Sequence, residues 1–328
     1  MYERHIPADF SGAVSVSQDG RILMQKAYGF ADRPNRIPNE VDTRFPTASA
    51  GKAFVAAAVM RLIRDGRLSL DTAIGDVLDF DLKRLDPGVT VRQLLNHTSG
   101  VPDYFDESVM NEYSDLFRDY PNYKIRTSKD LLPLFIDKPM AYSRGLKFQY
   151  NNSGYVLLGL MIEAVTGGPF DVYLENALFK PLKMNGTGYY ELDRLPAKCA
   201  AAYIEDPQTG GWRTNIYSVD VKGTGAGGAF TTVVDVERFW TGLIRGAILP
   251  VDAFSMMTAP QTSGGNYGFG FWLRPTNGRQ IPFFQGSDPG VAFVSSCDPE
   301  RRSIVTVVSN RAQNVWDLHR SIRAGLNA

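Results

Sequence analysis

Residues 47–66, TASAGKAFVAAAVMRLIRDG, set the architecture that we expect for this chain. After Ser49 the apolar side chains recur at three- and four-residue steps and Gly66 closes the run, which predicts a helix that begins directly after a loop. Ser49 and Lys52 are three residues apart and therefore share one face of this helix. The lysine amine then lies beside the serine hydroxyl, inside an apolar helix where desolvation can lower the pKa of the amine.

Ser49-Ala50-Gly51-Lys52 is the only Ser-x-x-Lys sequence in the chain. A serine hydroxyl is a poor nucleophile at neutral pH, and a neighbouring base is needed to accept its proton. The alternative is a serine that caps the N-terminus of the helix and a lysine that lies in solvent one turn later. Both interpretations place a helix here, and only the first predicts a catalytic site.

Strand patterns lie at both ends of the chain, and helical patterns lie between them. Alternating residues 10–16 and 22–30 flank a turn and predict an N-terminal hairpin. More strands are expected near the C-terminus, over residues 267–273, 281–284, 291–297 and 304–309. The expected helices cover residues 91–96, 152–165, 170–178, 231–244 and 315–326, and residues 101–147 form an irregular insertion.

We therefore expect an α+β fold with three layers (α/β/α), in which an antiparallel sheet built from both termini is flanked by helices. One catalytic domain is expected to cover residues 1–328. It combines an α/β lobe, residues 1–75 plus 225–328, with an inserted and mainly helical lobe, residues 76–224.

The composition argues against several classes of function. The 328 residues include 35 Lys+Arg and 35 Asp+Glu, and this balance disfavours nucleic acid or an anionic membrane as the partner. Three histidines and two cysteines without a recognised spacing predict no His/Cys metal site. A carboxylate-only Mg or Ca site stays open, but no EF-hand pattern and no nucleotide-binding motif is present, so we expect no cofactor. No apolar run is long enough for a membrane span, and the N-terminal residues lack a signal pattern, which predicts a cytoplasmic protein. The sequence leaves the oligomeric state open.

Tyr150-Asn151-Asn152 forms a second candidate group, directly before the strongest helix pattern. A tyrosine near a lysine can move protons, and an asparagine can orient both the substrate and the lysine. The alternatives are a core aromatic residue at Tyr150 and a helix cap at Asn152. Tyr120-Pro121-Asn122 has the same Tyr-x-Asn pattern, but it lies in the irregular insertion and is the poorer candidate.

Phe284-Gln285-Gly286-Ser287 forms a third candidate group at the end of an expected strand. A strand beside the nucleophile can offer a backbone N–H to a developing oxyanion, and its small residues let a substrate approach. The alternative is an ordinary hairpin turn, which Pro289-Gly290 also explains.

These groups occur in the order and contexts found in the superfamily of serine β-lactamases and penicillin-binding proteins, and the chain resembles its class C and family VIII esterase branch. Leu94-Leu95-Asn96-His97-Thr98-Ser99-Gly100 is similar to the LLxHTSG segment of that family, and Asp42-Thr43-Arg44-Phe45 is similar to its lead-in to the nucleophile. Further similarities lie at residues 181–184, 227–230 and 267–270. The resemblance covers nearly the whole chain and implies the β-lactamase/transpeptidase fold, with His97 supporting the structure rather than acting as a base.

The resemblance also implies roles for the candidate residues. Ser49 would be the acylated nucleophile, Lys52 its proton-accepting or field-setting partner, and Tyr150 the general base and acid. Asn152 would position the substrate and the lysine, and the backbone N–H groups of Ser49 and Ser287 would form the oxyanion hole. The sequence leaves open whether Lys52 or Tyr150 takes the first proton.

The third candidate group departs from the family pattern, because Phe284 stands where the family has Lys or His. A cation there would bind a substrate carboxylate, which Phe cannot do, although Gln285 could hydrogen-bond a carbonyl group. We therefore expect a serine hydrolase that forms an acyl-enzyme with a small-molecule acyl substrate, with neutral carboxylic esters as the leading class.

Alternatives of the same mechanism are an amidase, a D-aminopeptidase, a DD-peptidase-like enzyme or a weak class C β-lactamase. A catalytically silent ligand-binding relative is an alternative from another class. An unrelated α/β-hydrolase is disfavoured, because the segment around Ser49 lacks the first Gly of G-x-S-x-G.

Overall fold

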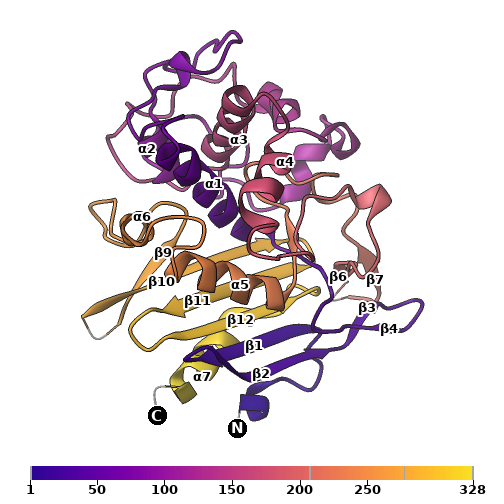
Figure 1. The fold of residues 1–328 in the computed structure, drawn as a ribbon. Coiled ribbons are helices and arrows are strands. Elements are labelled where there is room, and N and C mark those ends of the chain that lie inside the picture. The colour runs from indigo at the N-terminus through magenta and orange to yellow at the C-terminus, as the bar shows by residue number, and fades with distance from the viewer. Residues whose placement is uncertain (1, 207, 277, 327–328) are drawn as a thin grey trace.

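The computed structural model describes residues 2–206, 208–276 and 278–326 of the chain (Figure 1). Its largest element is a six-stranded antiparallel sheet in the order β2-β1-β12-β11-β10-β9. The N-terminal hairpin consists of β1 (Gly12–Gln18) and β2 (Arg21–Tyr28), and β1 pairs with β12 (Ser303–Ser309) near the other end of the chain. The prediction of a sheet built from both termini is therefore confirmed.

The second half of the sheet comes from the C-terminal part of the chain. It consists of β11 (Val291–Asp298), β10 (Arg279–Asp288) and the edge strand β9 (Trp272–Thr276). β10 is longer than the predicted strand, because it continues past Phe284 to Asp288 before the chain turns. Short two-stranded ladders join β3 (Phe30–Asp32) to β4 (Ile37–Pro38), β5 (Phe45–Pro46) to β8 (Phe230–Thr231), and β6 (Tyr203–Glu205) to β7 (Trp212–Thr214).

Helices cover both faces of the sheet. α7 (Val315–Leu326) packs on one face, in a buried cluster that includes Val307 of β12. The adjacent residue, Val308, points to the opposite face, where α5 (Val233–Ile244) covers the sheet. Successive side chains of a strand point to opposite faces, so both faces of β12 are buried. The α/β/α layers predicted from the sequence are confirmed (Figure 1).

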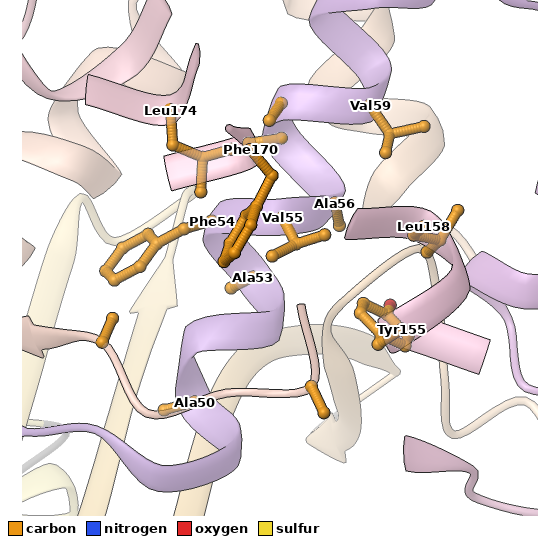
Figure 2. Close-up of a cluster of buried hydrophobic side chains, with 14 of the residues drawn as sticks. Ala50, Ala53, Phe54, Val55, Ala56, Val59, Tyr155, Leu158, Phe170 and Leu174 are labelled. Atoms are coloured by element: carbon orange, nitrogen blue, oxygen red, sulfur yellow. The ribbon is translucent and has the colours of Figure 1, made fainter. Parts of the chain in front are cut away.

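α1 (Lys52–Arg64) lies at the centre of the helical part, and ten of its 13 residues are buried. α3 (Asn152–Thr166) and α4 (Phe170–Leu174) enclose it, and Figure 2 shows Tyr155 of α3 and Phe170 of α4 beside it. A helix that is apolar on nearly every side is a core helix. The start of α1, next to Ser49, is therefore held firmly between the sheet and the neighbouring helices.

The other helical elements are short. They are α2 (Val91–Leu95), α6 (Val251–Met257), the 3-10 turns Tyr2–His5, Ala48–Gly51, Ile74–Asp76, Tyr113–Phe117, Asn122–Lys124, Ser128–Leu134 and Leu192–Arg194, and a π-helical segment, Glu175–Phe179. The helix predicted over residues 170–178 is thus α4 followed by the π-helical segment. Within the described ranges no single helix is long and apolar enough to cross a membrane, and one bent pair, α3 with residues 170–179, meets the length and composition criteria across a 76° bend.

Candidate active site

Ser49 lies in the 3-10 turn Ala48–Gly51, which leads directly into α1. The N-cap residue of α1 is Gly51, and no side-chain hydrogen bond caps the helix. The alternative that Ser49 is a helix cap is therefore wrong. The Ser49 hydroxyl oxygen instead accepts a hydrogen bond from Lys52 Nζ at 3.0 Å, as the three-residue spacing predicts.

Lys52 is buried, and its amine has two further hydrogen-bond partners. Nζ donates to Asn152 Oδ1 at 2.8 Å and to the backbone oxygen of Ala226 at 2.5 Å. Burial lowers the pKa of Lys52 to about 8, although nearby carboxylates oppose this change. These carboxylates are Glu107, Asp103 and Asp288.

The Ala226 carbonyl belongs to a glycine-rich loop, residues 223–228, that packs against the turn carrying Ser49. Gly227 in this loop has a φ of +150°, and a Cβ there would lie 2.5 Å from the backbone oxygen of Ala48. Only glycine allows this conformation and this approach. The loop therefore brings a backbone acceptor to the lysine amine without a side chain in the way.

Two neighbouring asparagines at the start of α3 have different partners. Asn151 is the N-cap of α3, and its Oδ1 accepts a hydrogen bond from the Gly154 N–H at 2.6 Å. Asn152 directs its Oδ1 to Lys52 and donates from Nδ2 to the backbone oxygen of Phe105 at 3.2 Å. The helix cap is therefore Asn151, and Asn152 is free to hold the lysine.

Tyr150 completes the group around Ser49. Its phenol forms a hydrogen bond with the Ser49 side chain, and the centroid of its ring lies 4.9 Å from Lys52 Nζ. Burial raises the pKa of Tyr150 well above its usual value of 10, so the phenol is protonated at neutral pH. Trp272 stacks on the ring with the two centroids 5.7 Å apart. The structure thus brings together four side chains that were selected from the sequence: Ser49, Lys52, Tyr150 and Asn152.

His97 holds the segment that carries Tyr150. Its Nδ1 accepts a hydrogen bond from the Asn151 N–H at 3.1 Å, and its backbone oxygen accepts one from the Gln149 N–H at 3.0 Å. Burial lowers the pKa of His97 well below its usual value of 6.5, so the ring is neutral. These contacts agree with the supporting role expected for this residue.

The other Tyr-x-Asn sequence lies outside this group. Tyr120 Oη donates a hydrogen bond to the backbone oxygen of Asp130 at 2.8 Å. Asn122 Nδ2 donates to the backbone oxygens of Ile216 and Val219. Both side chains thus join loops of the irregular insertion to their surroundings, and neither lines the cavity beside Ser49.

β10 passes directly beside the turn that carries the candidate nucleophile. A Cβ at Gly286 would lie 2.3 Å from the backbone oxygen of Thr47 and 2.6 Å from the backbone nitrogen of Ser49. Ser287, the next residue, is exposed and lines the same cavity as Ser49. Ser49 and Ser287 therefore both line this cavity, and β10 runs close to the backbone nitrogen of Ser49.

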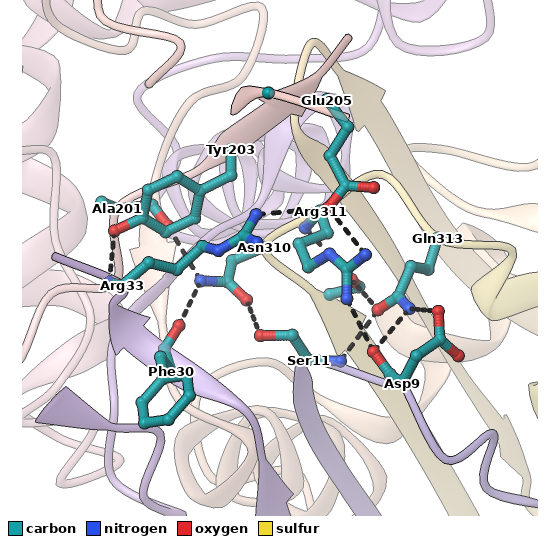
Figure 3. A network of polar contacts seen from close by, with 12 residues as sticks. Asp9, Ser11, Phe30, Arg33, Ala201, Tyr203, Glu205, Asn310, Arg311 and Gln313 are labelled. Atoms are coloured by element: carbon teal, nitrogen blue, oxygen red, sulfur yellow. Dashed lines mark hydrogen bonds and ion pairs between the residues drawn. The ribbon is translucent and has the colours of Figure 1, made fainter. Parts of the chain in front are cut away.

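A cavity of about 630 Å³ opens beside Ser49. Its acidic lining residues are Glu107, Glu112, Glu205, Asp220 and Asp288. Among the lining residues that the structure describes, Arg311 is the only lysine or arginine. Figure 3 shows its guanidinium beside the Glu205 carboxylate, with an N–O distance of 2.7 Å. This cation is already paired, so the free charge facing the cavity is negative.

Comparison with known proteins relates this geometry to one family. The family model described as Beta-lactamase matches residues 2–328. The chain belongs to the Beta-lactamase family. It is therefore a serine hydrolase with the fold of the penicillin-binding proteins, as the resemblance predicts.

Individual relatives agree with this assignment to the Beta-lactamase family. The relative named PbpX, from Bacillus subtilis (strain 168), is 27% identical over an alignment of 309 residues that covers 93% of this chain and 72% of PbpX. The crystal structure of a penicillin binding protein from Bacillus halodurans has a TM-score of 0.92 and 39% identity, over 96% of each chain. D-amino acid amidase from Ochrobactrum anthropi SV3 has a TM-score of 0.80 and 23% identity, over 99% of this chain and 97% of the amidase, which shows a shared fold.

Two predicted substrate contacts of this Beta-lactamase family chain need correction. Phe284 is 2% exposed and packs in the aromatic core beside Phe54, so its side chain does not reach the cavity. Gln285 points to the opposite face of the sheet, where its Oε1 accepts a hydrogen bond from Trp316 Nε1 at 2.8 Å. Because side chains alternate along a regular strand and β10 continues to Asp288, only the end of the strand reaches the cavity.

The carboxylates beside Ser49 were not predicted from the sequence. Asp288 lies two residues after Gly286 on the same face of β10, where it pairs with Val291 of β11. Its carboxylate has no hydrogen-bond or ion-pair partner among the residues that the structure describes. Asp220 accepts a hydrogen bond from Tyr113 Oη at 3.1 Å. Burial raises the pKa of both aspartates to about 7. Extending the expected strand by four residues would have placed Asp288 at the site, whereas nothing in the sequence indicates Asp220.

Proposed function

We propose that this chain hydrolyses small carboxylic esters through an acyl-enzyme on Ser49. The 3.0 Å contact between Ser49 Oγ and the buried amine of Lys52 carries this proposal. It pairs a hydroxyl with a base of lowered pKa at the wall of a cavity, which is what nucleophilic catalysis by serine needs.

Lys52 is the proposed acceptor of the first proton. A neutral amine has two N–H groups and one lone pair. Asn152 Oδ1 and the backbone oxygen of Ala226 accept two N–H bonds, so the lone pair is directed at the Ser49 hydroxyl. A pKa of about 8 leaves part of the amine neutral near pH 7, whereas the raised pKa of Tyr150 keeps its phenol protonated.

The following steps use the remaining groups of the site. Ser49 Oγ attacks the acyl carbon while its proton passes to Lys52, and the N–H groups of Ser49 and Ser287 hold the oxyanion. Tyr150 gives its proton to the leaving alcohol and regains one from Lys52. Water then attacks the acyl-enzyme, the protons move in the reverse direction, and the acid leaves with Ser49 restored.

The charge of the cavity supports a substrate without a carboxylate. Glu107, Asp220 and Asp288 line the cavity, and its one described cation, Arg311, is paired with Glu205. Penicillins and peptides ending in D-Ala both carry a carboxylate, which these side chains would repel in their ionised form. Neutral esters meet no such repulsion, so they remain the leading class even though Phe284 does not contact the cavity.

The same charge favours a second candidate function, the hydrolysis of amides or esters whose acyl group carries a free ammonium. An ammonium next to an unpartnered carboxylate such as Asp288 gains a charge-assisted hydrogen bond. D-amino acid amidase, a protein of the same fold, has a name that indicates such substrates. This candidate differs from the first in the acyl group and shares its mechanism.

A substrate panel tests the proposal and separates the two candidates. The panel is p-nitrophenyl acetate, p-nitrophenyl butyrate, D-alanine p-nitroanilide and a chromogenic cephalosporin, with turnover and intact mass followed for the wild type and Ser49→Ala. We expect turnover of the neutral esters, loss of about 1,000-fold or more in the variant, and an acyl adduct on the wild type only. Turnover of the anilide alone would favour the second candidate. A wild type that forms no adduct and turns over none of the substrates would contradict both and favour a silent ligand-binding relative.

Asp288→Asn separates the effect of the acidic wall from that of the nucleophile. We expect kcat/KM for D-alanine p-nitroanilide to fall about 10-fold relative to that for the neutral esters, because one charge-assisted hydrogen bond is lost. The raised pKa of Asp288 means that its ionisation destabilises the folded state fully above about pH 7 and progressively less as the pH falls. Asparagine should therefore raise the free energy of unfolding by about 1 to 3 kcal/mol at pH 8, and by less at pH 5.

Asp79→Asn is the matched control for this change, because Asp79 is exposed and does not line the cavity. Its kinetics and its unfolding curve should match those of the wild type at both pH values. Equal loss on neutral and amine-bearing substrates in Asp288→Asn would contradict a role of this charge in substrate selection.

A further inference from the structure

We propose that Asp103 is a positioning residue of this active site, which fixes the Asn152 side-chain amide in the orientation that presents its oxygen to Lys52. The inference rests on the proposed function, because it assigns a role within the same catalytic group. Asp103 does not touch Ser49 or the substrate in this scheme, and it acts through Asn152.

The contacts of the Asn152 amide determine its orientation. Nδ2 donates to Asp103 Oδ2 at 3.3 Å and to the backbone oxygen of Phe105 at 3.2 Å. Both partners are acceptors, so the nitrogen end of the amide belongs on their side. Oδ1 is left facing Lys52 Nζ, at 2.8 Å. A reversed amide would place an N–H against the lysine amine and an oxygen against a carboxylate, and both contacts would be unfavourable.

Asp103 is itself held in place by the first turn of α3. Its Oδ2 accepts a hydrogen bond from the Asn152 N–H at 2.8 Å, and its Oδ1 accepts from the Ser153 N–H at 3.1 Å and from Ser153 Oγ at 3.3 Å. The Phe105 N–H adds a contact to Oδ1 at 3.4 Å. The first N–H groups of a helix have no partner within the helix, so they stabilise a carboxylate that accepts their hydrogen bonds. One aspartate therefore orders both the helix start and the side chain that points from it.

The charge of Asp103 also acts on the lysine amine. It is one of three carboxylates, with Glu107 and Asp288, whose charge raises the pKa of Lys52 against the larger effect of burial. Besides the hydrogen-bond partners Ser49 and Asn152, the rings of Tyr150 and Tyr155 lie close to the amine. The charge of the amine in turn lowers the pKa of His97. The charge of Asp103 also helps to raise the pKa values of the phenols of Tyr104, Tyr142 and Tyr150.

Asp103→Asn tests this role, because it keeps the shape of the side chain. Its new NH2 group must face N–H donors, either those of Asn152 or those of Ser153 and Phe105. We expect kcat for the best ester to fall about 10- to 100-fold while KM changes less than about three-fold, because the lysine is held less well. We also expect the pH at which kcat/KM reaches half its maximum to fall by about half a pH unit or more, because Lys52 loses both a negative charge and its acceptor.

Two comparisons separate a positioning role from a structural one. Asp106→Asn is the matched control, since Asp106 closes a turn on Ser108 in the same loop and does not contact Asn152; its kinetics should be those of the wild type. In the Asn152→Ala background Asp103→Asn should lower kcat no further at the pH where the rate has levelled off, because the amide through which it positions the lysine is gone and the lysine is already neutral there.

The outcomes that would overturn the inference are specific. An unchanged kcat and pH profile in Asp103→Asn would do so, and so would an equal loss of kcat with and without the Asn152 side chain. If the wild type turns over no substrate, the proposed function fails, but the pKa of Lys52 can still be measured by NMR of lysine labelled with carbon-13 at Cε. A pKa of Lys52 that does not fall in Asp103→Asn would then overturn the inference on its own.

Discussion

Lys52→Met is expected to lower kcat/KM for the best ester by about 1,000- to 10,000-fold, because the proposed base is lost while its hydrophobic volume is kept. In the wild type kcat/KM should rise with pH and level off above about pH 8, since the neutral amine is the active form and the pKa of Lys52 is about 8. In the variant this rise should disappear. Hydrolysis of p-nitrophenyl butyrate between pH 6 and 10 measures both effects.

Stability measurements show whether Lys52→Met loses activity because the base is missing or because the fold is weakened. The pKa of Lys52 is lower in the folded protein than its ordinary value of 10.5, so the folded state binds fewer protons than the unfolded state between about pH 8 and 10.5. The buried charge therefore destabilises the fold fully below pH 8, and less as the pH rises toward 10.5. Methionine removes this penalty but leaves two acceptors without a donor, which costs about 1 to 3 kcal/mol each. We expect a melting temperature near that of the wild type.

Lys180→Met, at an exposed position, is the control for a general effect of removing a lysine. It should leave both the rate and the pH profile unchanged. A Lys52→Met enzyme that keeps the pH-dependent rise would contradict the assignment of Lys52 as the first proton acceptor and favour Tyr150.

The parts of the fold that follow from local pattern could be predicted from the sequence. α7 has the predicted bounds, and β11 and β12 lie within one residue of the expected strands, because buried β-branched runs between turns have few alternatives. Ser49 and Lys52 were also predictable, because their contact depends only on the spacing of residues in one helical turn. Tyr150 and Asn152 were candidates from their place before a strong helix pattern, but their roles required the family resemblance, since nothing local says that α3 packs beside α1.

The residues that the sequence analysis misplaced depend on where a strand ends. The expected strand ends at Phe284, with residues 284–287 ending that strand beside the nucleophile and opening a tight turn. The strand in fact continues to Asp288, so strict alternation sends Phe284 into the core and Gln285 to the far face. Strand ends are set by tertiary pairing, here with β11, which a single sequence does not display.

Gly286→Ala is expected to lower kcat/KM at least 100-fold and the free energy of unfolding by about 2 to 3 kcal/mol. The new Cβ would lie 2.3 Å from the backbone oxygen of Thr47 and 2.6 Å from the backbone nitrogen of Ser49. These neighbours are backbone atoms of a turn that is fixed by the buried α1, so β10 must move away from the nucleophile. Ester turnover and chemical denaturation measure the two losses.

Two variants show whether the separation of β10 from the turn causes the loss. Gly168→Ala places a methyl group where no atom lies within 4 Å, so it should change neither activity nor stability by much. Ser287→Ala removes the hydroxyl but keeps the backbone N–H that is proposed to hold the oxyanion, and its rate should stay within a few-fold of the wild type. Wild-type activity in Gly286→Ala would mean that the N–H groups of Ser49 and Ser287 need not keep their positions relative to each other. This result would contradict the proposed oxyanion hole. A large loss in Gly286→Ala with little change in Ser287→Ala would instead mean that β10 contributes through its backbone. Gly286 permits this, because without a side chain the strand can lie against the backbone of Ser49.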